Sequence, residues 1–189
     1  MPLTPRTERA LEACYDALLA PARWSSSLQR LAESLGGVSC LFYEHDRDSS
    51  APRPMSTEHD AFSDLWNRNE PHAPDPHVGL YLERCKFFIR SGYGSAIEHQ
   101  FSTEEERKTL PYFQETARPA RREWLAFAYF SVEGDDWCLP VYRGDDRGPF
   151  TPADAKGLAK VGPPSPKSSA WPESSPHSTP RRNSRCWSE

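Results

Sequence analysis

The chain has 189 residues, and its 23 Lys and Arg against 27 Asp and Glu give a formal net charge of −4. Because phosphate neutralisation requires clustered positive charge, an acidic chain of this kind predicts no DNA binding. The sequence has neither the roughly 20 consecutive apolar residues of a membrane span nor the apolar run of a signal peptide, so a soluble, cytoplasmic protein is expected.

Two helices are predicted ahead of the first strand. Thr4 and Pro5 offer an N-cap and a proline at the first helical position. Apolar residues at helical spacing follow, namely Leu11, Cys14, Tyr15, Leu18 and Leu19. Pro21 ends this helix. The second helix begins near Trp24 and ends at the glycine pair 36–37.

The next part of the chain alternates between apolar runs and breakers. Residues 38–43 (VSCLFY) predict the first strand, and residues 44–54 predict a polar loop. Thr57 caps a helix that we expect to end near Asn69. Residues 70–76 contain three prolines and cannot be regular, and a further helix is expected from Pro76.

A short edge strand over residues 95–101 and another helix are predicted next. Ser102 and Glu105 have the spacing of a capping box, and Pro111 would stop or bend the helix that they open. Near the end of the ordered part, Thr151, Pro152 and Asp154 combine an N-cap, a proline and a carboxylate at the third helical position, which predicts a final helix that ends near residue 162.

The strongest sheet signal is the stretch from Trp124 to Tyr142, read as a hairpin with its turn at residues 133–136. Side chains of a strand alternate between two faces. One face of the first strand would carry Trp124, Ala126, Ala128, Phe130 and Val132, and the other Leu125, Phe127 and Tyr129. Since both faces are apolar, each must be covered or must line a pocket.

The order of the elements predicts an α/β chain of the α+β kind, with a PAS- or GAF-like antiparallel sheet flanked by helices. Residues 1–162 would form one domain, which is long enough for a substantial core. Residues 163–189 contain 6 Pro and 8 Ser among 27 residues and predict a disordered tail.

The residues that point most clearly to a ligand are Phe62, Trp66, Asp75 and Pro76. Two aromatic residues four apart share a helical face, and a carboxylate follows a proline-constrained loop. Aromatic side chains can form the apolar walls of a pocket, and one carboxylate can accept a hydrogen bond from a ligand. Trp137 is a further candidate wall. In the alternative interpretation, both aromatics are core residues and Asp75 only caps the helix begun by Pro76.

Signatures of catalysis and of metal binding are missing from the sequence, so we expect no enzyme, no metal and no cofactor. His72 and His77 flank Asp75, but prolines interrupt the ligand spacing. The five cysteines lack paired spacing, and reduced thiols are expected.

Several segments together resemble the N-terminal sensor domain of LuxR-type transcriptional regulators from proteobacteria. The similar segments are DLWNRNEPHAPDPH, FSTEEERKTLPYFQE, DDWCLPVYR and RGPFTPADAKGLAKVGP. In the autoinducer-binding branch, aromatic residues and an Asp-Pro pair line the acyl-homoserine-lactone pocket, and Phe62, Trp66, Asp75 and Pro76 stand at matching spacing. The tryptophan that the branch places about fifteen residues after its aspartate falls here near Arg90. A lactone, another small molecule and no ligand therefore stay open.

The resemblance also implies what would surround this domain. Such regulators carry a linker helix and a DNA-binding helix-turn-helix after the sensor and act as dimers, so a homodimer or a heterodimer with an intact regulator is expected. With permissive codon choices, a one-nucleotide shift just after Pro163 gives a segment with helical periodicity. We therefore expect residues 163–189 to be an out-of-frame tail. The alternatives are a natively disordered tail and a free-standing small-molecule-binding or protein-interaction module of PAS or GAF type.

Overall fold

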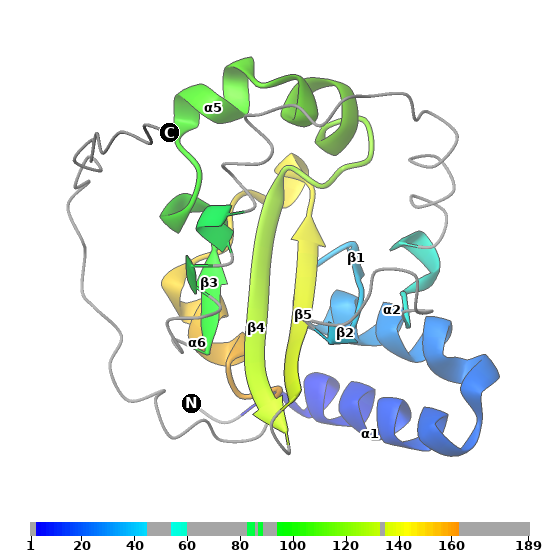
Figure 1. Cartoon of the computed structure of the whole chain (residues 1–189). Helices are drawn as coiled ribbons and strands as arrows, with labels where there is room; N and C mark the ends of the chain where they lie inside the picture. Colours follow the sequence, from blue (N-terminus) through cyan, green and yellow to red (C-terminus); the bar gives the residue numbers. More distant parts are fainter. Residues whose placement is uncertain are drawn as a thin grey trace, which may run out of the picture.

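An antiparallel sheet built on a long hairpin organises the chain (Figure 1). The hairpin strands are β4 (Trp124–Val132) and β5 (Asp135–Arg143). β3 (Ser95–Ile97) pairs with β4, while β1 (Ser39–Cys40) and β2 (Tyr43–Glu44) pair with β5. The computed structural model describes residues 3–44, 54–59, 83–85, 87–88, 94–132 and 135–162. Within them, the helices and the antiparallel sheet confirm the predicted α+β class.

The hairpin has the predicted division into two faces. Ala126 and Ala128 pack into one buried cluster, and Leu125 and Phe127 pack into another. The turn is shorter than predicted, because residues 135–136 already belong to β5 and pair with the end of β4. An extended ladder satisfies more backbone donors and acceptors than a longer loop would.

Three helices cover the first face of the sheet, and all three were predicted. They are α1 (Pro5–Leu19), α2 (Trp24–Ser34) and α6 (Pro152–Leu158). The predicted caps hold, because the Thr4 hydroxyl accepts a hydrogen bond from the Thr7 amide and the Thr151 hydroxyl accepts one from the Asp154 amide. The apolar cluster on this face includes Ala10, Leu28, Leu31, Leu139, Val141, Ala155 and Leu158.

The buried stripe of α1 differs from the predicted one. Small residues, Ala10 and Ala17, are buried, whereas Tyr15 and Leu19 are 66% and 93% exposed. Small side chains let α1 approach α2 closely, and the Ser27 hydroxyl of α2 donates to the Ala13 carbonyl at 2.9 Å. Leu11 and Cys14 of the predicted stripe do pack against the core. The rest of the stripe was wrong because hydrophobicity alone ranks leucine above alanine, while close helix packing favours alanine.

The predicted first strand is divided into β1 and β2, and Pro140 explains the break. Both short strands keep one register with β5, in which Leu41 lies opposite Pro140. The Leu41 amide donates to the Pro140 carbonyl at 3.4 Å, but Pro140 has no N–H to return the hydrogen bond. Leu41 instead forms a bridge with Met55.

β3 begins at its predicted residue but ends early, and the helix after it begins one residue later than predicted. β3 is an edge strand, as predicted, but it gives way to the short 3-10 helix η2 (Glu98–Gln100). Thr103 caps α5 (Glu104–Thr109), and its side chain pairs with Glu106, one residue after the predicted capping box. The Ser102 hydroxyl cannot serve as this cap because it lies 3.3 Å from the Glu98 carbonyl oxygen and 2.8 Å from Nη1 of Arg107.

After Pro111 the chain continues as the π-helical segment η3 (Tyr112–Ala117), which places Phe113 under the sheet as predicted. The predicted helices after Thr57 and Pro76 are described only at residues 57–59, 83–85 and 87–88, which are helical. Residues 163–189 lie outside the described residues, so the predicted tail stays a prediction. None of the described helices is both long enough and apolar enough to cross a bilayer.

Candidate functional site

The second face of the sheet carries an unusual number of tyrosines. Tyr43, Tyr129 and Tyr142 come from β2, β4 and β5, and Tyr112 joins them from η3. Register explains the grouping, because Tyr43 and Tyr129 both lie opposite Cys138, and Tyr142 lies opposite Leu125. We call this surface, with Leu125, Phe127 and Cys138 between the tyrosines, the tyrosine face.

The four tyrosines differ in environment from the residues between them. Leu125, Phe127 and Cys138 are buried, whereas each tyrosine is only half-buried. Burial nevertheless raises the pKa of Tyr142 to about 12 and raises the pKa of Tyr43 and Tyr112 well above the ordinary value. At neutral pH these hydroxyls are therefore uncharged and can both donate and accept hydrogen bonds.

A buried carboxylate lies beside the tyrosine face. Glu98 is 1% exposed, and its Oε2 accepts a hydrogen bond from the Leu125 amide at 3.2 Å. Burial first, and then charges that include Glu98, raise the pKa of Tyr112 and Tyr142. η2 positions this side chain, because the chain turns inward where β3 ends.

A buried guanidinium lies at the Tyr142 end of the same face. The Arg122 guanidinium lies 5.1 Å from the centroid of the Tyr142 ring, and its Nη2 donates to the Glu58 carbonyl at 2.9 Å. Its Nη1 is 3.0 Å from Nδ1 of His59. Since a guanidinium can only donate, Nδ1 of His59 accepts and the imidazole is neutral. Burial lowers the pKa of Arg122 to about 10 and that of His59 to about 3.

The predicted site residues are placed only in part. Phe62, Trp66, Asp75 and Pro76 lie outside the described residues. Trp137, predicted as a further pocket wall, is described and lies on the face of the sheet opposite the tyrosine face. It pairs with Phe130 across the hairpin and stacks on Phe42 with 4.8 Å between ring centroids, on the side covered by helices. Strand alternation makes the two placements mutually exclusive.

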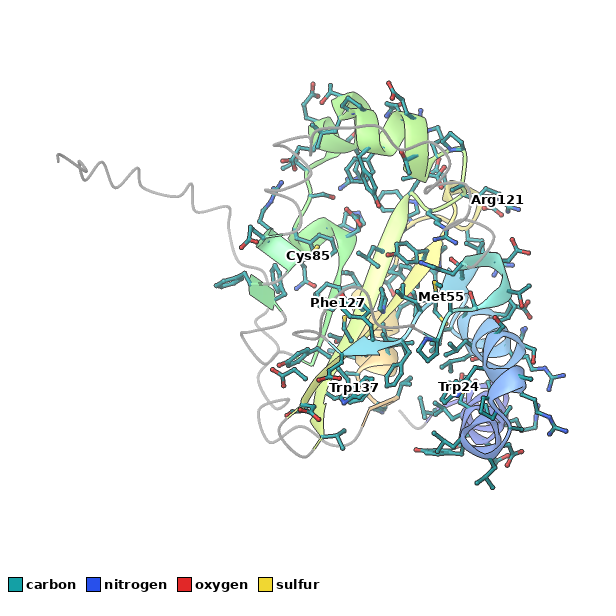
Figure 2. All side chains as sticks on the ribbon, turned by 45° about the vertical axis from the view of Figure 1, so that its right-hand side comes forward. Trp24, Met55, Cys85, Arg121, Phe127 and Trp137 are labelled. Atoms are coloured by element: carbon teal, nitrogen blue, oxygen red, sulfur yellow. The ribbon has the colours of Figure 1, made fainter. Side chains whose placement is uncertain are left out.

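Figure 2 shows these relations on the side chains. Phe127, in the middle of β4, and Cys85 belong to the buried cluster on the tyrosine face. Trp137 lies near the hairpin turn, and Arg121 lies at the opposite end of the two strands. The sheet therefore separates two aromatic groups, the tyrosine face and the stack of Phe42, Phe130 and Trp137.

Sequence reasoning missed the polar members of this site. Tyr129 was assigned to the correct face, but only as an apolar residue. Nothing in the local sequence distinguishes Glu98, Arg122 and His59 from surface residues, since charged side chains are mostly exposed. The one usable signal was the position of Glu98 directly after an apolar strand, where a side chain can turn into the core.

The described part of the chain offers little evidence for a catalytic thiol or a metal centre. Burial raises the pKa of Cys138 to about 12 and that of Cys14 to about 11, so these thiols are protonated at neutral pH and are poor nucleophiles. No group of three or more potential metal ligands occurs among the described residues.

Comparison with known proteins gives matches at the level of structure alone. No family model and no curated protein sequence matches the chain. Among solved structures, it is similar to the N-acylhomoserine lactone dependent LuxR family transcription factor CepR2 from Burkholderia cenocepacia, with 13% identity and a TM-score of 0.49 over 82% of this chain and 89% of that chain. It is also similar to the VqsR LBD domain from Pseudomonas aeruginosa, with 18% identity and a TM-score of 0.46 over 84% and 90% of the two chains.

Proposed function

We propose that the chain is the sensor domain of a LuxR-type regulator and that it binds a small molecule on the tyrosine face. The observation that carries the proposal is the pairing of four half-buried tyrosines with a buried carboxylate, Glu98, and a buried guanidinium, Arg122. Charged side chains are almost never fully buried, so Glu98 and Arg122 beside one sheet face favour a role beyond packing. The sequence motifs that resemble LuxR-type sensors agree with this assignment.

The chemistry of the face favours an amphipathic ligand. Phe127 and Leu125 offer apolar contact, and the tyrosine hydroxyls offer a few directed hydrogen bonds, which is the usual composition of a small-molecule site. Because the hydroxyls are neutral, they suit amide, ester or lactone groups better than a bare charge. We infer an apolar body with one or two carbonyl groups, and N-acylhomoserine lactones are the first compounds to test.

Phe62, Trp66 and Asp75 complete this proposal from the sequence. The two aromatics would cover the apolar part of the ligand, and the Asp75 carboxylate would accept a hydrogen bond from an amide N–H or a hydroxyl. We propose no catalytic role for any residue. A homodimer, or a heterodimer with an intact regulator, is the proposed assembly, and DNA binding by this chain is not expected. A free-standing binding or interaction module on the same fold is the second candidate.

Thermal-shift and calorimetric titration of the full chain against lactones and common metabolites tests the proposal. Tyr129→Phe and Tyr142→Phe each remove one hydroxyl and should weaken binding roughly threefold to tenfold. Trp66→Ala and Asp75→Ala should weaken it further. Tyr15→Phe, on the exposed side of α1, is the matched control and should leave affinity unchanged.

Two outcomes would contradict the proposal. One is a panel in which no compound raises the melting temperature. The other is a bound compound whose affinity is equal in the wild-type chain, Tyr129→Phe and Tyr142→Phe, since the ligand would then lie elsewhere. If the chain binds no compound of the panel but captures a protein partner in a pull-down, the interaction module is favoured.

A further inference from the structure

An open hollow lies apart from the apolar middle of the tyrosine face. It has a volume of about 590 Å³ and is lined by residues of α1 and α2, by residues 37–39 and 119–122, and by Glu58 and Arg147. We call it the arginine hollow, because Arg6, Arg121, Arg122 and Arg147 all line it. It borders the tyrosine face at Arg122 and Ser39, and it does not depend on the proposed sensor function.

The charges around the arginine hollow are unbalanced. Four arginines face two glutamates, Glu33 and Glu58, in a chain whose net charge is negative. The exposed pair of Arg6 and Glu33 is loose, with 3.6 Å between nitrogen and oxygen. Among the described residues, Arg147 forms no ion pair with a carboxylate, and the one hydrogen bond of its guanidinium, to the Gly36 carbonyl, is long at 3.4 Å. The hollow therefore keeps positive charge that is not neutralised.

Ser39 provides an independent sign of a missing partner. Ser39 is fully buried and is one of the residues that line the hollow. Its hydroxyl has no hydrogen-bond partner in the described part of the chain. The Cα pairing of Ser39 with Tyr142 puts its side chain on the same side of the sheet as the Arg122 guanidinium. A buried hydroxyl without a partner is unfavourable, so an acceptor that reached Ser39 from the hollow would be stabilised there.

The backbone at the rim is strained in a way that brings two arginines to the hollow. Arg121 has φ = 55°, in the left-handed region that residues other than glycine seldom adopt. The turn is closed by hydrogen bonds from Arg121 N to Arg118 O at 3.0 Å and from Arg122 N to Ala117 O at 2.7 Å. As a result Arg121 lies at the exposed rim, paired with Asp146 at 2.8 Å, while Arg122 points inward. Strained residues of this kind are concentrated at functional sites.

We propose that the arginine hollow binds the phosphate group of a small molecule, with Arg147 and Arg121 at the rim and the Ser39 hydroxyl as a donor in the wall. Guanidinium groups bind phosphate oxygens through paired N–H donors, and a hydroxyl completes the coordination of an oxyanion. The volume exceeds what a bare phosphate needs, so the hollow has room for the organic part of a phosphate monoester.

The test uses the full chain and measures binding by NMR and calorimetry at constant ionic strength, with chloride as the balancing ion. Inorganic phosphate and phenyl phosphate are the probes, and acetate separates phosphate from carboxylate recognition. The expected result is a saturable shift of the amide signals of residues 38–39, 121 and 147, with phenyl phosphate at least as tight as phosphate and acetate much weaker.

Variants separate a specific site from general positive charge. Arg147→Gln should weaken phosphate binding roughly tenfold or more, and Arg118→Gln, an exposed arginine outside the hollow, is the matched control. Ser39→Ala should be at least as stable as the wild-type chain without phosphate, yet should gain less stability when phosphate is added. No saturable shift, an equal loss in Arg118→Gln, or acetate binding equal to phosphate binding would each overturn the proposal.

Discussion

Nδ1 of His59 lies 3.0 Å from Nη1 of Arg122, and both side chains are buried against the Tyr142 ring. The contact requires a neutral imidazole, because a protonated ring would put two donors face to face. Burial first, and then the charge of Arg122, lowers the pKa of His59 from 6.5 to about 3.

This contact predicts a loss of stability in acid. Between pH 6.5 and about 3, the unfolded chain takes up a proton at His59 that the folded chain does not, so the free energy of unfolding falls as the pH falls, by up to about 1.4 kcal/mol per pH unit. Above pH 6.5 the contribution is fully present. Urea denaturation across this range should show a flatter pH profile for His59→Gln than for the wild-type chain. Parallel profiles would show that His59 is already protonated in the fold.

Arg143 ties the end of α2 to the segment that leads into α6. Its guanidinium lies 3.8 Å from the centroid of the Phe150 ring and donates to the carbonyls of Gly36 at 3.0 Å and Leu35 at 3.3 Å. Arg143→Met should lower the free energy of unfolding by about 2–4 kcal/mol, because it removes the Arg143 donors to the half-buried carbonyls of Leu35 and Gly36 and leaves Asp154 without its buried partner.

Arg143→Lys should recover only part of this loss, since an ammonium cannot reproduce the planar arrangement of donors. Arg9→Met, at an exposed position of α1, is the control and should change stability little. An equal effect of Arg143→Met and Arg9→Met in chemical denaturation would mean that the contacts of the Arg143 guanidinium do not stabilise the fold.

Replacing glycine by alanine should have opposite effects on stability at Gly37 and Gly157. A Cβ at Gly37 would meet Val141 Cγ1 at 2.5 Å and the Tyr142 carbonyl oxygen at 2.8 Å, so Gly37→Ala should cost about 1–3 kcal/mol. A Cβ at Gly157, inside α6, would meet nothing within 4 Å, and Gly157→Ala should add about 0.5–1 kcal/mol. Melting temperatures that move in the same direction in both variants would contradict the packing described here.

The position of Trp137 predicts which aromatic substitutions leave ligand binding intact. Trp137 stacks on Phe42 on the helix-covered side, so Trp137→Phe should lower stability without changing the affinity of a ligand bound on the tyrosine face. Tyr129→Phe should do the reverse. Calorimetry and denaturation of both variants check this pair, and a loss of affinity in Trp137→Phe would return Trp137 to the site.

Local sequence predicted the elements whose signals are short in range. The caps at Thr4 and Thr151, the glycine stop after α2 and the alternating faces of the hairpin were all correct, because each depends on neighbours within a few residues. Elements that depend on partners elsewhere in the chain were less accurate. Pro140 interrupts a strand that is distant in sequence, and Glu98 ends β3 by turning toward β4.

The candidate site was still harder to predict, because its residues come from distant parts of the chain. Sequence by itself determined that the hairpin is apolar on both faces, so that each face must be covered or must line a pocket. Only the tertiary structure decided that four tyrosines, Glu98 and Arg122 meet on that face, that Trp137 lies on the other, and that four arginines from three separate places line one hollow with Ser39. The physical reason is that strand register and helix packing set which distant side chains meet, and burial then decides the protonation and hydrogen bonding of polar groups that look alike in the sequence.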